Sequence, residues 1–206
     1  MSTLFKGLDG QDRCAWAGSA PDFLDYHDQE WGYPVGDDIR LFEKVCLESF
    51  QSGLSWRTIL AKRGNFRTAF AGFDPVEVAA FDQVKVEALL QDAGIIRHRG
   101  KIEAVINNAA RALELQQEAG SLAAFFWSFE PDLATLPPPQ TQTTSPDSIA
   151  LSKALKKRGW KFVGPTTCFA FMQAMGLIND HALGCCCRAK AAEARASFEK
   201  PVPRFA

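Results

Sequence analysis

The strongest constraint on the fold is a set of potential metal ligands that lie near both ends of the chain. Cys14 and His27 lie near the N-terminus, and His181 and Cys185 lie near the C-terminus. If residues 181–185 form a helical turn, the two side chains of that i,i+4 pair point to the same side. Two cysteines and two histidines fill all positions of a tetrahedral zinc, which is typical of closed structural sites. The set predicts one structural Zn²⁺ that joins the two ends of the chain.

The spacing of these ligands leaves other interpretations open. The two halves lack the tight double pattern of a zinc finger, so they could be unrelated buried cysteines and surface histidines. A zinc hydrolase would need three protein ligands and a position open to water, and the four ligands available here argue against it.

Composition predicts a soluble globular protein. The chain has 206 residues, of which 47% are hydrophobic and 23% charged. It is long enough for one large or two small domains. The first residues include no long apolar stretch, so we expect neither a signal peptide nor a membrane span, and a cytoplasmic location. In that compartment the six cysteines are expected to be thiols or metal ligands. Nothing in the sequence demands more than a monomer.

Apolar residues recur at helical spacing through most of the chain, and strand-like alternation never persists. The sequence therefore predicts an all-α fold. Helix-start and helix-stop signals bound several segments, such as the capping-box pattern at Asp74 and the glycine at 120. The predicted helices cover residues 37–52, a short segment from Pro75, a segment from Asp82 that stops at Gly94, a long segment that ends before Gly120, and residues 121–129, 148–158 and 165–175.

Two segments do not follow the helical pattern. Residues 130–146 contain three consecutive prolines and a Gln/Thr/Ser stretch, which predicts a loop inside the fold. Residues 188–206 alternate basic and small residues and end in two prolines, so we expect a loosely ordered tail. The sequence contains no internal repeat.

A glycine-bounded turn at 94–101 joins two predicted helices. A helix–hairpin–helix motif uses such a turn, and the dipole of its second helix, to bind a DNA phosphate. The alternative is a simple helix connection, and Ile96 stands where a second early glycine is usual. Net charge is −1, so any DNA-binding surface must come from local basic clusters. The turn supplies Gly94, Arg97, Arg99, Gly100 and Lys101. A second basic cluster, which could equally be a solvated helix face, comprises Lys153, Lys156, Lys157, Arg158 and Lys161.

Glu48 is the acidic residue of greatest interest because it borders the apolar face of the predicted helix 37–52. Beside Tyr26, Trp31 and Trp56 it would make a pocket for a flat, electron-poor or cationic ring. Each aromatic face attracts a cation by about 0.5–2 kcal/mol. A carboxylate adds negative charge and a hydrogen-bond acceptor. The alternative is an exposed glutamate at a helix edge, with the aromatic residues in ordinary core packing.

Six blocks of sequence together resemble one known family, the 3-methyladenine DNA glycosylase I family. The resemblance runs in order from about residue 13 to residue 187 and implies a single DNA glycosylase domain over 13–187. The blocks are Arg13-Cys14-x-Trp16, Tyr26-His27-Asp28-x-Glu30-Trp31-Gly32, Leu47-Glu48 with Gln51-x-Gly53-Leu54-Ser55-Trp56, residues 92–101, Lys156-Lys157-Arg158-Gly159, and Asn179-Asp180-His181 with Gly184-Cys185-Cys186-Cys187.

The resemblance implies a helix–hairpin–helix glycosylase fold and a role for individual residues. Glu48 matches the base-recognising carboxylate of the family, and Tyr26 and Trp56 match its stacking aromatics. Gly53 and Leu54 match the stretch that probes the gap left in the duplex. Trp16 and Trp31 match the supporting wall, and the zinc ligands match Cys14, His27, His181 and Cys185. Two positions depart from relatives: Phe23 removes a tyrosine hydroxyl, and Ala170 replaces a serine.

The activity implied is the excision of cationic 3-methyladenine from double-stranded DNA, which leaves an abasic site. Methylation at N3 weakens the glycosidic bond, so the enzyme mainly has to extrude the nucleotide and hold it. The sequence marks no aspartate to activate the attacking water, and no lysine placed like a Schiff-base lysine, so we expect no strand cleavage. A non-catalytic helix–hairpin–helix module is the alternative, but it would have no use for a carboxylate among aromatic rings.

Overall fold

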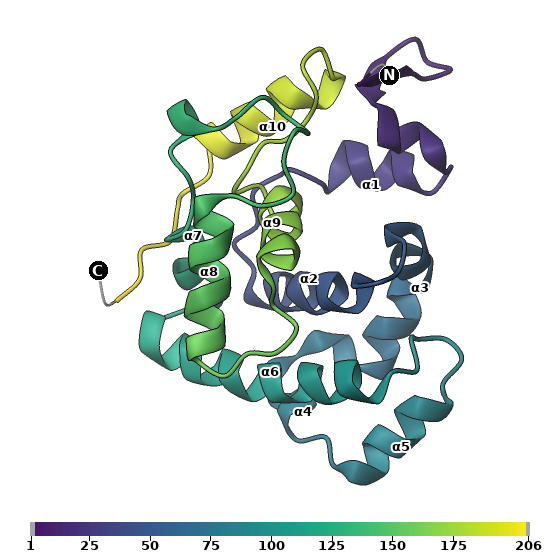
Figure 1. Cartoon of the computed structure of the whole chain (residues 1–206), viewed down its shortest axis with the longest axis vertical. Helices are drawn as coiled ribbons and strands as arrows, with labels where there is room; N and C mark the ends of the chain where they lie inside the picture. Colours follow the sequence, from purple (N-terminus) through teal and green to yellow (C-terminus); the bar gives the residue numbers. More distant parts are fainter. Residues whose placement is uncertain (1–2, 205–206) are drawn as a thin grey trace.

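Helix α2 (Asp38–Gln51) forms the centre of the computed structural model, which describes residues 3–204 (Figure 1). Every residue from 41 to 50 is buried. The helix contacts α3 (Trp56–Ala69), α6 (Arg99–Ala119), α7 (Leu122–Trp127) and α9 (Pro165–Ala174). A helix surrounded in this way carries polar side chains into the interior, so each of them needs a partner there.

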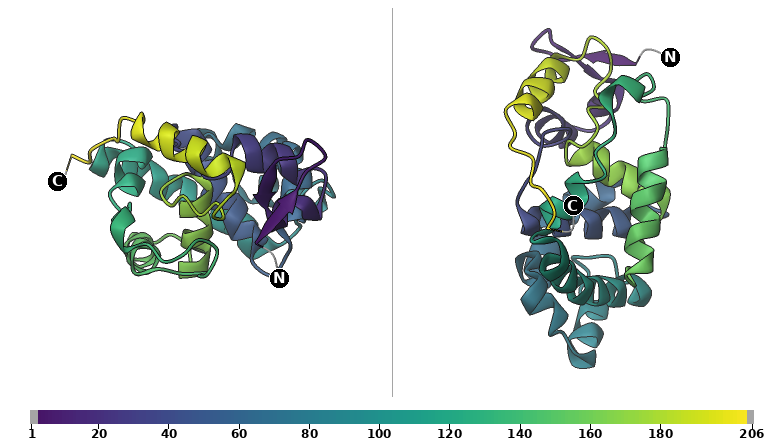
Figure 2. Two further views of the ribbon diagram at one scale, coloured as in Figure 1. Left: turned by 90° about the horizontal axis from the view of Figure 1, so that it is seen from above. Right: turned by 90° about the vertical axis from the view of Figure 1, so that its left-hand side faces the viewer.

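The hydrophobic core around α2 is rich in phenylalanine. Several of these rings stack on one another, and the centroids of Phe70 and Phe73 lie 5.6 Å apart. Figures 1 and 2 show the N-terminal segment and α10 (Cys186–Ala196) together at one end of the molecule, and α4 (Pro75–Ala79) and α5 (Gln83–Gln91) at the other. The largest fully buried aromatic side chains are Trp127, Phe42, Phe50, Phe66, Phe70, Phe73, Phe125, Phe126 and Phe171.

The predicted helices are confirmed to within a few residues at their ends. Asp74 and Asp82 cap α4 and α5, and Gly120, with φ of 94°, ends α6. Ser145 caps α8 (Pro146–Lys157) through a capping box. Helices α1 (Phe23–Gln29) and α3 were not predicted from the sequence. Helix α3 contains Gly64 and a weak apolar stripe, so tertiary packing rather than local pattern fixes it. Short 3₁₀ turns occur at η1 (Ala15–Ser19), η2 (Ala71–Phe73) and η3 (Leu133–Thr135).

The prediction of an all-α fold is incomplete, because the chain begins with a small sheet. Strands β1 (Leu4–Lys6) and β2 (Asp12–Cys14) pair antiparallel, with Phe5 opposite Arg13. Strands of three residues are too short for alternation to be recognised in a sequence.

The prediction of a loosely ordered tail at 188–206 is also wrong over the described residues. Helix α10 continues to Ala196, and Arg195 forms an ion pair with Glu130 with a 2.6 Å contact. The Phe198 ring lies 4.7 Å from that of Trp127, and the Arg204 backbone N–H donates to the Ala119 carbonyl. These contacts join segments far apart in the sequence, so no local pattern reveals them. Among residues 3–204, no helix is long and apolar enough to cross a membrane.

Candidate active site and metal centre

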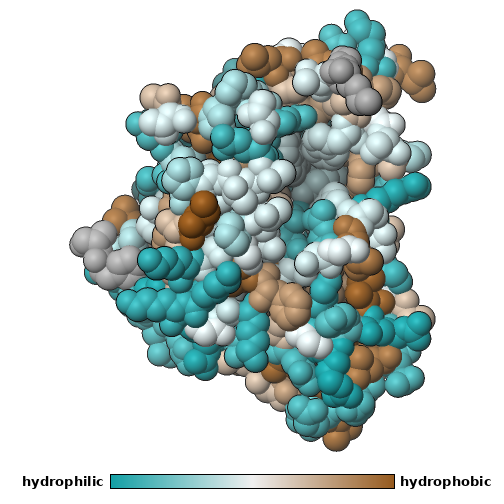
Figure 3. All heavy atoms as spheres, in the orientation of Figure 1, coloured by the Kyte–Doolittle hydropathy of each residue, from teal (hydrophilic) through white to brown (hydrophobic). Residues whose placement is uncertain are grey.

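A cavity of about 440 Å³ lies beside the C-terminal half of α2, and its walls are mostly aromatic. Figure 3 shows a recess on this face of the molecule. Glu48 lines the cavity with a side chain that is only 5% exposed, so its carboxylate does not face bulk solvent. The structure thus brings together every residue that the sequence assigned to the pocket: Trp16, Phe23, Tyr26, Trp31, Glu48 and Trp56.

The aromatic walls come from several segments that are separate in the sequence. Trp16 lies in η1 and contacts Phe23 and Trp31 edge-to-face, with ring centroids 5.7 and 5.1 Å apart. The Tyr26 ring of α1 lies 5.3 Å from that of Trp56, the first residue of α3. Such contacts fix the orientation of each ring. The indole N–H of Trp56 is buried and has no hydrogen-bond partner within the described chain.

Lys44, one helical turn before Glu48, is a site residue that the sequence interpretation missed. Its Nζ lies 2.8 Å from Glu48 Oε1 and donates a 2.6 Å hydrogen bond to the Tyr26 hydroxyl. The same ammonium lies 3.5 Å from the centre of the Trp56 ring. Burial lowers the pKa of Lys44 and raises the pKa of Tyr26. The i,i+4 spacing of Lys44 and Glu48 was the available signal.

A second ion pair joins Glu30, the residue that follows α1, to Arg63 of α3. Arg63 donates to both carboxylate oxygens of Glu30, at 2.6 and 2.8 Å. Burial opposes ionisation of Glu30, but the hydrogen bonds from Arg63 outweigh it, and the pKa of Glu30 is lowered. The pair holds the two helices that carry Tyr26 and Trp56.

The opposite wall of the cavity is polar. Asp180 accepts hydrogen bonds from the Gln140 backbone N–H at 2.8 Å and from Gln173 Nε2 at 2.6 Å. Burial raises the pKa of Asp180. These contacts hold the loop that follows Pro139 against the cavity. Ala170, one of the two departures from the family pattern, also lines this space, as does the other, Phe23.

The loop between α2 and α3 presents an apolar side chain next to the pocket. Gly53 has φ of 79°, a conformation that favours glycine, and Leu54 is 42% exposed. Lys101 holds this loop in place, because its Nζ donates to the carbonyls of Phe50 and Ser52 at 2.8 and 2.6 Å. The prediction that Lys101 contacts a DNA phosphate is therefore corrected: the side chain is buried and its ammonium is used inside the protein.

The turn between α5 and α6 keeps the other predicted hairpin residues near the surface. His98 caps α6 by accepting from the Lys101 backbone N–H. The Gly94 backbone N–H donates to the Asp92 carboxylate at 2.7 Å. Arg97 is exposed, whereas Arg99 pairs with Glu87 at 2.6 Å. Gly100 lies in the first turn of α6.

An exposed aromatic residue next to this turn was also missed. Phe162 is 41% exposed and has φ of 56°, which is unusual for a bulky residue. Its carbonyl accepts from Ser49 Oγ at 3.0 Å, and its ring lies 6.4 Å from that of His98. In the second basic cluster, Arg158 pairs with Glu118. The remaining members of that cluster are exposed: Lys153, Lys156, Lys157 and Lys161.

The four predicted metal ligands meet in one buried cluster, with their ligand atoms all within 4.8 Å of one another. His181 Nδ1 lies 3.7 Å from Cys14 Sγ and 3.6 Å from Cys185 Sγ, which in turn lies 3.5 Å from His27 Nε2. A tetrahedral Zn²⁺ with ordinary Zn–S and Zn–N bonds separates such atoms by about 3.6 Å. The cluster therefore has the size of a Cys₂His₂ zinc site.

The remaining ring nitrogens in the cluster also have partners. His27 Nδ1 lies 2.7 Å from an Asp28 oxygen, and His181 Nε2 lies 3.0 Å from the Trp31 carbonyl. Such contacts orient imidazole ligands at metal sites. Burial lowers the pKa of His181 to about 4 and raises the pKa of Cys14 to about 12. The expected helical turn at 181–185 is instead a non-helical turn, closed by the Cys185 N–H to the Ala182 carbonyl.

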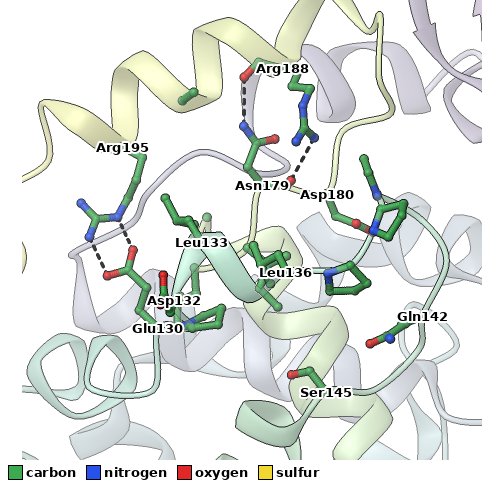
Figure 4. Close-up of a pocket in the computed structure, with 18 of the residues that line it drawn as sticks. Glu130, Asp132, Leu133, Leu136, Gln142, Ser145, Asn179, Asp180, Arg188 and Arg195 are labelled. Carbon is green, nitrogen blue, oxygen red and sulfur yellow. Dashed lines mark hydrogen bonds and ion pairs between the residues drawn. The ribbon is translucent and has the colours of Figure 1, made fainter.

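A larger cavity, of about 1060 Å³, lies between α10 and the loop 130–145. Figure 4 shows Leu133 and Leu136 at its wall and the ion pair of Arg195 with Glu130 at its rim. Arg188 donates from its guanidinium to the Asn179 carbonyl at 3.2 Å. Size alone would favour this cavity, but the smaller cavity combines a buried carboxylate with aromatic walls, which makes the smaller one the candidate active site.

The comparisons with known proteins agree with one another. The family model described as methyladenine glycosylase matches residues 16–189. The chain is 53% identical to DNA-3-methyladenine glycosylase 1 of Escherichia coli K12 and 46% identical to DNA-3-methyladenine glycosylase of Haemophilus influenzae. These alignments cover 85% of this chain, and 96% and 97% of the relatives. A structure of 3-methyladenine DNA glycosylase I from Staphylococcus aureus, which addresses 3-methyladenine recognition, superposes with a TM-score of 0.79 at 36% identity, covering 85% and 96% of the two chains.

Proposed function

The chain belongs to the methyladenine glycosylase family, and we propose that it flips 3-methyladenine out of alkylated DNA and excises it by hydrolysis. It is an N-glycosyl hydrolase of the DNA-3-methyladenine glycosylase type. The observation that carries the proposal is the buried Glu48 carboxylate at the wall of an aromatic cavity. A space of about 440 Å³ is ample for a purine base.

The chemistry of the pocket suits a cationic purine. Tyr26 and Trp56 stack on the flipped base, and Glu48 accepts from its exocyclic amine. Attraction of the positive ring to aromatic faces and to a carboxylate is strongest in a water-poor site. Unmodified adenine lacks the charge, gains less from these groups and has a stronger bond to break. The methylated base leaves as a neutral molecule, so it needs little proton donation.

The loss of the base then leaves a positively charged sugar, which a water attacks at C1′. Such an oxocarbenium-like sugar is stabilised by negative charge nearby. The Glu48 carboxylate and the DNA phosphates are the anions near the flipped nucleotide in this proposal. In this proposal the main contribution of the protein is to extrude the nucleotide from the stack, at a cost of a few kcal/mol, and then to hold it.

Contacts with the duplex come from two surface segments. Leu54, with Gly53 before it, fills the gap that the flipped nucleotide leaves, because it is an exposed apolar side chain next to the pocket. The turn of the helix–hairpin–helix element, with Gly94 and Gly100, presents the N-terminus of α6 to a phosphate. Arg97 adds positive charge there, and Arg99 contributes less because of its pairing with Glu87.

A structural Zn²⁺ held by Cys14, His27, His181 and Cys185 is part of the proposal. The separations between the ligand atoms and the partners of both imidazoles support it. These four ligands would fill a tetrahedral site, so the ion would supply no open position for chemistry and would serve to hold the two ends of the chain together.

The enzyme is proposed to be monofunctional, without strand cleavage. Lyase chemistry requires a free lysine amine near C1′. The amines of Lys44 and Lys101, the buried lysines among residues 3–204, are both engaged, with Glu48 and Tyr26 or with backbone carbonyls.

The decisive experiment is base release from methylated duplex DNA, followed by chromatography of the free bases. Wild-type protein should release 3-methyladenine and leave intact strands with abasic sites. Glu48→Gln keeps the size of the side chain and should reduce release by about 10²-fold or more, as for other removed electrostatic groups. Absence of release by folded wild-type protein would refute the proposal.

A further inference from the structure

Lys44 puts a positive charge directly behind the wall of the aromatic cavity. Its side chain is about as buried as that of Glu48, at 6% and 5% exposed, and the two groups form a 2.8 Å ion pair. Glu48 is among the residues that line the cavity, whereas Lys44 is not. The pair is neutral overall, and its negative end faces the space where the base would bind.

Neither charge is stable alone at this depth. Burial favours the neutral form of an isolated carboxylate, and it favours the neutral form of an isolated lysine. An opposite charge within hydrogen-bond distance favours the charged form of each group, although burial still lowers the pKa of Lys44. The Lys44 ammonium therefore acts as a fixed counter-ion for the Glu48 carboxylate in the aromatic pocket.

The other charged groups near the pocket have partners of their own. Glu30 and Arg63 form a separate ion pair, with a 2.6 Å contact. Asp180 is held by the hydrogen bonds of Gln140 and Gln173. Within the described chain, Lys44 is thus the cation in contact with Glu48, and Tyr26 accepts from the same ammonium.

We propose that Lys44 is a positioning residue that supplies the counter-ion of the Glu48 carboxylate and holds Tyr26 and Trp56 around it, so that the empty pocket is already arranged for a cationic base. This inference rests on the proposed function. One ammonium fixes three walls at once, because it bonds the carboxylate and the phenol and lies 3.5 Å from the centre of the indole ring. Preorganised charge of this kind costs no rearrangement when the substrate arrives.

The test is the pH dependence of single-turnover excision from methylated duplex DNA. The positive charge of 3-methyladenine within DNA does not depend on pH in the acidic range. A fall in the excision rate toward low pH, the acid limb of the profile, therefore reports a group of the enzyme and not the substrate. Lys44→Met removes the charge and keeps the length of the side chain. In this variant the carboxylate in the pocket loses its counter-ion, and the acid limb should move to higher pH relative to wild type. Lys44→Gln should show the same shift if Lys44→Met folds poorly.

Two controls separate positioning from packing. Lys101→Met removes the other buried lysine, which bonds only carbonyls, and should lower the rate without moving the acid limb. In a Glu48→Gln background, Lys44→Met should leave the remaining pH profile unchanged, because the carboxylate that Lys44 pairs with is gone.

The outcomes are distinct. A folded Lys44→Met or Lys44→Gln variant whose pH profile runs parallel to that of wild type would overturn the inference and leave Lys44 a packing residue. A shifted limb that persists in the Glu48→Gln background would overturn it as well. Failure of wild type to release 3-methyladenine at any pH would instead refute the proposed function.

Discussion

Lys101 Nζ lies 2.6 Å from the carbonyl oxygen of Ser52, so the first turn of α6 is bonded to the loop that follows α2. A second hydrogen bond, to the Phe50 carbonyl, closes the C-terminal end of α2. The element proposed to contact phosphate and the element proposed to fill the gap in the duplex are therefore one rigid unit. Because this lysine is buried and bonds two carbonyls at the end of a helix, we expect it to act on DNA through the position of Leu54 rather than by direct contact.

Lys101→Met should lower excision and stability while leaving the salt dependence of DNA binding unchanged. The variant removes the donor of the buried Phe50 carbonyl and of the partly buried Ser52 carbonyl, at a cost of about 1–3 kcal/mol. The slope of log affinity against log salt should match wild type, because no phosphate contact is lost. Arg97→Ala is the matched comparison, and the magnitude of its salt slope should decrease by about 1, because one phosphate contact is lost. A reduced slope in Lys101→Met would mean that the ammonium reaches phosphate in the complex.

Leu54→Ala should reduce excision from duplex DNA by roughly 10–100-fold, because burial of a leucine side chain in the gap is worth about 1.5–3 kcal/mol. The loss should be smaller on single-stranded substrate, where no gap has to be filled. Val84→Ala removes another exposed apolar side chain, 77% exposed on α5, and should have no effect on either substrate. Equal losses on both substrates would contradict the role of Leu54.

Cys14→Ser should abolish stoichiometric zinc binding and lower the melting temperature, because the ion joins segments at the two ends of the chain. Elemental analysis and thermal unfolding measure these two effects. Cys186→Ser is the control, since Cys186 lies next to a ligand but outside the set of four, and it should retain one zinc per chain. Full zinc content in Cys14→Ser would show that the ligand set is different.

Glu130→Gln should destabilise the protein at neutral pH by about 1–3 kcal/mol, because it breaks the ion pair that holds α10. Burial opposes ionisation of Glu130, but hydrogen bonds from Arg195 and Lys200 lower its pKa. A lowered pKa gives stability that is present above the unfolded-state value, about 4.3, and is lost as pH falls through the folded value. The difference in melting temperature between variant and wild type should therefore shrink below about pH 4. Glu199→Gln, which is exposed, should show no such difference.

Much of the helical framework could be predicted from local signals. Asp37, Asp82 and Ser145 begin their helices by accepting backbone N–H groups, and Gly120 ends α6 with a positive φ. These signals act within a few residues of one another, so the sequence displays them directly. Strands β1 and β2 lacked such signals, and helix α3 had only its N-cap, Ser55, without a strong apolar stripe, so long-range packing decided them.

The sequence by itself determined the chemical types of the site: a glutamate among aromatic residues, and two cysteines and two histidines divided between the ends of the chain. Only the tertiary structure decided that Lys44 faces Glu48 and Tyr26, and that Lys101 is used inside the protein. It also decided that the segment after α9 returns to the N-terminal hairpin, where α10 contacts β2. The physical reason is burial: residue types are fixed by the sequence, but the partner of a buried charge depends on which helices surround it.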